Sequence, residues 1–277
     1  MHRKDYRGLD WTSGCEDSIE RQMRVDYSSS TVHLCVRQKN LAKVQTMRIA
    51  SIIDVSTVDV PGIPVTVLFT AGCNFDCPYC QNAQIIPLSS GSEMPIEVIV
   101  GKTCGSLSSG LCVSGGEPTI HRDLPELLGE LKRVRGGHIN LNTQGSVPEV
   151  LEESLPYIDS VWFDIKAAPD RYSQVARVRE NPWNAVHKSI EMVMSSNVAF
   201  WPRTTYAADL MSPHDIEGVL HILEEEDFQG EYVLRNFVRS LGTRRSEDSN
   251  LRAAKREEVE PLFERLPSGI TLKLEGF

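Results

Sequence analysis

Two kinds of apolar segment alternate along most of this 277-residue chain. Short runs rich in Val, Ile and Phe, such as residues 65–70 and 160–166, are typical of buried strands. Longer segments with the apolar spacing of an amphipathic helix, such as residues 123–134, lie between them. This alternation predicts an α/β fold, in which parallel strands are joined by right-handed crossovers and covered by helices. About six repeats favour a partial (β/α)6 TIM-like barrel over a closed eight-fold barrel.

The individual elements follow from the same patterns. Strands are expected at residues 48–54, 65–70, 111–115, 138–143, 160–166, 199–206, 231–237 and 270–275. Helices are expected at residues 123–134, 147–155, 184–194, 214–226 and 250–266. In parallel α/β folds the chemistry sits at the C-terminal ends of the strands, so polar residues at those ends are the candidates for a functional site.

The first 46 residues differ from the rest of the chain. They are polar, contain a serine run at Ser28–Ser30, and show no sustained apolar period. We therefore expect an N-terminal extension over residues 1–46 and a catalytic domain over residues 47–277. We hypothesise that Met47 is the natural start of translation; a natively expressed protein that begins at Met1 would contradict this.

Charge and hydropathy restrict the partners and the location. The formal net charge is −9, and the sequence contains no dense Lys/Arg run long enough to follow a phosphate backbone, so nucleic acid is not expected as a partner. No segment approaches the roughly 20 apolar residues that span a bilayer. The polar start MHRKDYRGLD also lacks the apolar core of a signal peptide. A cytoplasmic protein without membrane contact is expected.

Three of the seven cysteines crowd into one short segment, at Cys73, Cys77 and Cys80. In a reducing compartment this crowding indicates metal ligation rather than disulfides. Directly after a strand, three thiolates can hold one face of a [4Fe-4S] cluster and leave one iron open. A structural zinc site, completed by His121 or Cys112, is an alternative, and so are ordinary buried cysteines. No cysteine follows Cys112, so a second cluster is not expected from the C-terminal half.

The Cys-x3-Cys-x2-Cys spacing, with Tyr79 before the last cysteine, resembles the signature of the radical S-adenosylmethionine (SAM) superfamily. The longer string IDVSTVDVPGIPVTVLFTAGCNFDCPYCQN resembles the activating proteins of glycyl-radical enzymes, namely anaerobic ribonucleotide reductase and pyruvate formate-lyase. The resemblance implies a [4Fe-4S] cluster and SAM as cofactors. In that family an electron from the cluster splits SAM into methionine and a 5'-deoxyadenosyl radical.

The resemblance also implies a function. An oxidoreductase of this kind removes a glycine Cα hydrogen and leaves a glycyl radical on a partner enzyme. We expect anaerobic ribonucleoside-triphosphate reductase as the partner and a flavodoxin or ferredoxin as the electron donor. The alternatives are a pyruvate formate-lyase-type activase, a radical SAM enzyme acting on another substrate, and a zinc-binding interaction module without catalysis.

The resemblance also implies which residues bind SAM, because several motifs of the family have a match in this sequence. Tyr79 lies where the family contacts adenine, largely through the backbone. Gly115, Gly116 and Glu117 belong to LCVSGGEP, which resembles the glycine-rich motif that meets the SAM ammonium. An ordinary turn at the end of a strand is the alternative reading of the two glycines.

Two further strand ends carry polar residues that the resemblance places beside SAM. Asn142 and Thr143, followed by Gln144, correspond to residues lining the SAM pocket, although turn residues of no further consequence would look the same. Asp164 and Lys166 resemble an Asp-x-Lys element that contacts SAM, and a surface ion pair is the alternative.

Arg203 is a candidate partner for the SAM carboxylate or ribose, because its planar fork suits carboxylates. A structural salt bridge with Asp164 is the competing interpretation. Where pyruvate formate-lyase activases carry a histidine, Asn236 or Arg239 could substitute. His121, at a predicted helix start, is assigned no role.

Overall fold

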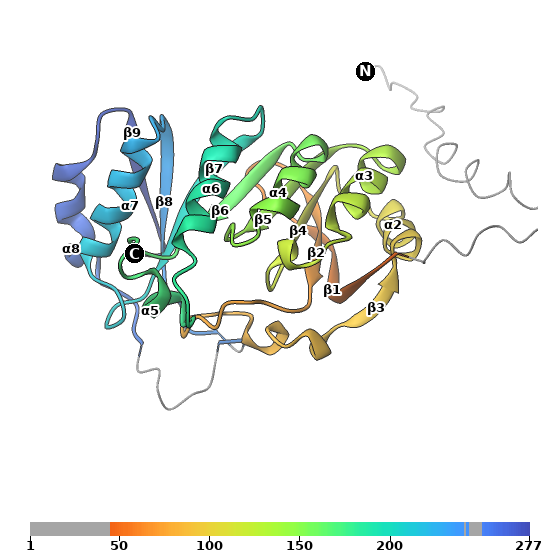
Figure 1. Cartoon of the computed structure of the whole chain (residues 1–277), viewed down its shortest axis with the longest axis horizontal. Helices are drawn as coiled ribbons and strands as arrows, with labels where there is room; N and C mark the ends of the chain where they lie inside the picture. Colours follow the sequence, from red (N-terminus) through yellow and green to blue (C-terminus); the bar gives the residue numbers. More distant parts are fainter. Residues whose placement is uncertain (1–44, 241, 244–250) are drawn as a thin grey trace, which may run out of the picture. The chain divides into compact units, whose positions relative to one another are not determined.

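The computed structural model describes residues 45–240, 242–243 and 251–277. The predicted extension of residues 1–46 therefore lies, apart from its last two residues, outside the described part. The described residues form a nine-stranded sheet with the order β3-β1-β2-β4-β5-β6-β7-β8-β9 (Figure 1).

Seven neighbouring strands of this sheet are parallel. They are β2 (Val65–Thr70), β4 (Gly110–Gly115), β5 (His138–Thr143), β6 (Ser160–Asp164), β7 (Ala199–Tyr206), β8 (Gly230–Asn236) and β9 (Ile270–Glu275). Two antiparallel strands, β1 (Thr46–Ser56) and β3 (Ser92–Pro95), extend the sheet beyond β2. Within the described residues β3 and β9 do not pair with each other, so the barrel is open. The predicted partial α/β barrel is confirmed.

Helices cover one face of the sheet (Figure 1). The longer ones are α2 (Ile96–Cys104), α3 (Leu124–Val134), α4 (Pro148–Ser154), α6 (Trp183–Met194) and α7 (Pro213–Glu225). Their apolar stripes share one large core with alternate residues of the strands, for example Leu127 and Leu131 of α3 with Leu111 and Val113 of β4. The shorter elements are α5 (Tyr172–Ala176), α8 (Arg256–Val259) and the 3-10 turns η1 (Ala83–Ile85), η2 (Leu88–Ser90), η3 (Pro118–Ile120), η4 (Leu155–Tyr157) and η5 (Glu260–Arg265).

The other face of the sheet, which forms the barrel interior, has a small core of its own. Val65, Val67 and Cys112 project into it, and Val60 from the turn between β1 and β2 packs against them. Trp162 of β6 donates its indole N–H to the carbonyl of Asp59 in the same turn, at 3.0 Å. Because Val65 begins β2, this turn fills the N-terminal end of the barrel.

The predicted strands are all present, whereas one predicted helix is largely wrong. Instead of a helix over 250–266, the structure has only α8 followed by the 3-10 turn η5. Arg252 forms a bridge with Ala208, and the backbone N–H of Ala254 donates to Asn236 at 2.9 Å, so this stretch is held against other elements. Pro261 lacks the N–H that an α-helix would need there. The elements β3, α2 and α5 were not predicted.

Among the described residues, no helix combines the length and the apolar character needed to cross a membrane.

Candidate active site

A cavity of about 320 Å³ opens at the C-terminal ends of the parallel strands. All the residues predicted from the sequence for the cluster and for SAM line it: Cys73, Cys77, Tyr79, Cys80, Gly115, Gly116, Glu117, Asn142, Thr143, Asp164, Lys166 and Arg203. They come from the loop after β2, the ends of β4, β5 and β6, and the middle of β7. The structure thus brings together residues that lie up to 130 positions apart in the sequence.

Backbone hydrogen bonds hold the cysteine loop that follows β2. The N–H of Cys73 donates to the carbonyl of Ile86 at 3.0 Å, and the N–H of Asp76 donates to the carbonyl of Ala176 at 3.0 Å. The ring of Phe75 packs edge-on against Tyr172, with 6.3 Å between the centroids. The three cysteines are therefore presented on a loop that two other segments fix in place.

Burial makes the thiols of this loop weak acids. It raises the pKa of Cys73 to about 12, with the Glu117 carboxylate adding to the effect. It also raises the pKa of Cys77 to about 11, although the ammonium of Lys166 opposes the rise. At neutral pH these sulfurs stay protonated unless a metal cation displaces the protons, so metal loading should release protons.

The sulfurs of the three cysteines are not gathered as closely as the ligands of a bound zinc ion would be. In tetrahedral coordination with Zn–S bonds of about 2.3 Å, the sulfurs lie about 3.8 Å apart. Among the described residues, the one group of three His, Cys, Asp or Glu ligand atoms within 4.8 Å of one another is His187, Glu191 and Glu226, which does not include the cysteines. The three cysteine sulfurs therefore do not all lie within 4.8 Å of one another in this structure.

The residues suggested as a fourth zinc ligand are engaged elsewhere. His121 hydrogen-bonds the carbonyl of Ala71, and Cys112 is fully buried in the core of the barrel interior. Neither residue lines the cavity.

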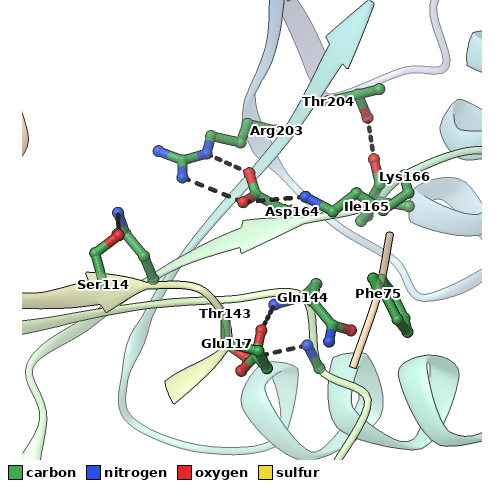
Figure 2. A network of polar contacts seen from close by, with 12 residues as sticks. Phe75, Ser114, Glu117, Thr143, Gln144, Asp164, Ile165, Lys166, Arg203 and Thr204 are labelled. Atoms are coloured by element: carbon green, nitrogen blue, oxygen red, sulfur yellow. Dashed lines mark hydrogen bonds and ion pairs between the residues drawn. The ribbon is translucent and has the colours of Figure 1, made fainter. Parts of the chain in front are cut away.

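Glu117 forms the buried polar centre of the cavity wall (Figure 2). Its carboxylate accepts from the backbone N–H and the hydroxyl of Thr119, at 3.0 and 2.6 Å. It also accepts from the Thr143 hydroxyl at 2.6 Å and from the Gln144 N–H at 2.9 Å. Burial raises the pKa of Glu117, while these donors oppose the rise. Because four donors occupy the carboxylate, the Glu117 side chain holds the ends of β4 and β5 in position relative to each other.

Neighbouring backbone atoms leave no room for a side chain at either glycine of the motif. A Cβ on Gly115, which has φ of +129°, would overlap the backbone of Thr70, and a Cβ on Gly116 would overlap the carbonyl oxygen of Gly72. Gly72 precedes the first cluster cysteine. The glycine motif therefore lets the end of β4 lie directly against the cysteine loop.

Replacement of Gly116 should thus damage the fold at the cysteine loop. We expect Gly116→Ala to lower the free energy of unfolding by about 3 kcal/mol, because backbone atoms must move. Gly101 of α2 is the matched control, since a Cβ there meets nothing within 4 Å. Gly101→Ala should stabilise the helix by about 0.5–1 kcal/mol. Urea unfolding of both apo-proteins measures the difference, and equal stabilities would refute the packing argument.

Two carbonyl oxygens in the wall have no hydrogen-bond partner among the described residues. The Asn142 amide donates to Ser114 at 3.2 Å and the Gln144 amide donates to Ser146 at 2.7 Å, yet Asn142 Oδ1 and Gln144 Oε1 are buried and unpaired. An unsatisfied buried acceptor costs about 1–3 kcal/mol. Because both residues line the cavity, these oxygens fit a ligand that carries N–H or O–H donors, as SAM does.

A three-residue charge cluster forms the opposite wall (Figure 2). The Asp164 carboxylate accepts from Arg203 Nε at 2.5 Å and Nη2 at 3.3 Å, and Lys166 Nζ lies 3.3 Å away. Burial alone would raise the pKa of Asp164, but Arg203 and Lys166 outweigh it and hold the pKa far below its usual value. Two cations face one anion, so the cluster has an excess positive charge that suits the SAM carboxylate.

Several cavity residues were missed in the sequence. Thr205 and Arg235 also line the cavity, and period-two alternation from Arg203 along β7 could have indicated Thr205. Asp59 lines it from the turn inside the barrel, which no local pattern signals. Asn236 and Arg239, suggested as substitutes for a family histidine, are not among the lining residues.

Comparison with known proteins agrees with this geometry. The family model of the radical SAM superfamily matches residues 67–225, more than half of the chain. A Methanocaldococcus jannaschii protein, named provisionally as a glycyl-radical enzyme activating enzyme, is 30% identical over 194 residues, which are 68% of this chain and 79% of that protein. The pyruvate formate-lyase-activating enzyme of Staphylococcus aureus is 34% identical over 131 residues, 42% of this chain and 51% of that enzyme.

Among solved structures, QueE from Escherichia coli has a TM-score of 0.51 at 14% identity, over 83% of this chain and 94% of that one, which supports the fold. The chain belongs to the radical SAM superfamily. Within the superfamily it is related to the activating enzymes of glycyl-radical enzymes. The family prediction is confirmed, and with it the expectation of a [4Fe-4S] cluster and SAM as cofactors.

Proposed function

We propose that this protein activates a glycyl-radical enzyme, with anaerobic ribonucleoside-triphosphate reductase as the partner. When bound by Cys73, Cys77 and Cys80, the cluster would pass one electron from an external reductant to SAM, and SAM would supply the 5'-deoxyadenosyl group that takes up a hydrogen atom from a glycine Cα of the partner. The relatives named for glycyl-radical activation support the class of substrate. The string STVDVPGIPVTVLFTAGCNFDCPYCQN, which resembles the reductase activators, supports the particular partner.

In this proposal Cys73, Cys77 and Cys80 bind the cluster. Arg203 and Lys166 attract the SAM carboxylate, and Asp164 holds both cations in the wall of the cavity. The acceptors of Asn142 and Gln144 receive hydrogen bonds from SAM, and the Tyr79 backbone contacts its adenine.

The size of the cavity is compatible with a macromolecular substrate, which the named relatives support. Its volume of about 320 Å³ lies at the lower end of the ~300–1,000 Å³ that pockets for one small molecule usually have. A cluster and SAM together would occupy it, so the reacting group must enter from the mouth. A flexible loop of a partner protein can enter in this way, because the rest of the partner stays outside.

The test combines the loaded enzyme, SAM, a low-potential flavodoxin or ferredoxin, and purified anaerobic ribonucleoside-triphosphate reductase without oxygen. We expect an electron paramagnetic resonance (EPR) doublet of a protein glycyl radical, absent when the glycine of the reductase is replaced by alanine. Formation of 5'-deoxyadenosine without a protein radical would contradict the proposed partner. A radical on pyruvate formate-lyase instead would assign the protein to that partner.

A further inference from the structure

His121 lies directly after the 3-10 turn η3, four residues beyond Glu117, and was assigned no role from the sequence. Its Nε2 atom is 2.9 Å from the carbonyl oxygen of Ala71. A carbonyl only accepts, so Nε2 carries the hydrogen and donates it. The ring is partly buried and does not line the cavity.

Ala71 directly follows β2, begins the cysteine loop and lies two positions before Cys73. Its N–H donates to the carbonyl of Arg48 at 2.9 Å, so the backbone here is fixed on the side of β1. The His121 ring holds the next peptide group, between Ala71 and Gly72, on the other side of the Ala71 Cα. Any displacement of Ala71 would move the first cluster ligand with it.

A second contact joins the same two segments. The backbone N–H of Glu117 donates to the carbonyl of Gly72 at 2.8 Å. The turn from Glu117 to His121 therefore binds two successive carbonyls, those of Ala71 and Gly72, with one backbone donor and one side-chain donor. The same turn carries the Glu117 carboxylate that orients Thr143 and Gln144.

We propose that His121 is a positioning residue that holds the start of the cysteine loop in the geometry that retains the cluster. It acts through the Ala71 carbonyl, without contact to iron or SAM. It also links the cysteine loop to the turn that orients the acceptors of the SAM pocket. The required property is a side-chain N–H donor at this place, not an imidazole as such.

Three variants test this proposal. His121→Phe keeps a ring but removes the donor, whereas His121→Gln keeps an N–H donor. His138→Phe is the matched control, because His138 Nε2 also makes a single side-chain hydrogen bond, to Ser160 at 2.8 Å, but at the start of β5. Each protein is reconstituted with iron and sulfide without oxygen. The measurements are the rate of iron loss to a chelator, the EPR spectrum of the reduced cluster with and without SAM, and the apo-protein melting temperature.

We expect His121→Phe to lose iron about 3- to 10-fold faster than wild type, as the loss of one hydrogen bond implies, with an altered EPR spectrum. His121→Gln should restore both values, and His138→Phe should keep wild-type iron retention even if it melts earlier. Equal iron loss from His121→Phe and wild type would overturn the proposal. Equal loss from the Phe and Gln variants, or from the His138 control, would overturn it too.

Discussion

Cys77→Ala should yield a folded protein that assembles no [4Fe-4S] cluster and cleaves no SAM, a loss of at least about 1,000-fold, because the cofactors carry the chemistry. Cys77 is buried and lines the cavity with Cys73 and Cys80. Three thiolates are needed to hold a cluster whose fourth iron stays open for SAM. Removal of the small side chain should cost only about 1 kcal/mol of stability, so the apo-protein remains available for comparison.

Cys104→Ser is the matched control for this variant. Cys104 ends helix α2, is partly buried, and does not line the cavity. The Cys104 variant should therefore load iron and sulfide as wild type does. The measurements are the iron and sulfide contents after anaerobic reconstitution and the 5'-deoxyadenosine formed. A Cys77→Ala protein with a full cluster would show that the ligands have been misassigned.

Asp164→Ala should be the most destabilising change in the SAM-facing wall, by about 3 kcal/mol, and should weaken SAM binding. Arg203 and Lys166 are largely buried and would lose the anion between them. Breaking a buried ion pair by removing one partner commonly costs 3–5 kcal/mol, and the neighbouring cavity admits some water, so we expect the lower end of that range.

Glu231→Ala on β8 is the control, since its carboxylate pairs with Lys273 at 3.5 Å on the surface. That variant should change stability by less than about 1 kcal/mol. The pH dependence gives a second check. Because the pKa of Asp164 is depressed in the folded protein, its stabilisation is complete at neutral pH, begins to be lost as the pH falls below about 4, and is gone only below the depressed pKa. Identical acid unfolding of wild type and Asp164→Ala would contradict the assigned role.

The strands were predicted well from the sequence because both faces of the sheet are covered, so that its strands appear as short continuous apolar runs. The run at 138–143, for example, coincides with β5. The helix predicted over 250–266 was wrong because contacts with distant parts of the chain outweighed the helical spacing. One of them is the hydrogen bond from the Ala254 N–H to the Asn236 side chain. Local pattern cannot register such long-range contacts.

For the site, the sequence located residues at strand ends but few of the contacts between them. The ion pair of Arg203 with Asp164 was suggested from the sequence only as the alternative to a SAM contact, and the structure confirms that the pair forms, since the register between β6 and β7 places the two residues opposite each other. Asp59 was missed because the turn that carries it folds back into the barrel interior. His121 was missed because its hydrogen bond crosses 50 positions of sequence to reach Ala71.

The claim that this protein cleaves SAM at a [4Fe-4S] cluster is tested most directly by anaerobic reconstitution of the wild-type protein with iron and sulfide. The reconstituted protein is reduced by dithionite with SAM, and 5'-deoxyadenosine is quantified. We expect 5'-deoxyadenosine and methionine in equal amounts, dependent on both the cluster and the reductant. A fully assembled and reduced cluster that leaves SAM intact would contradict it.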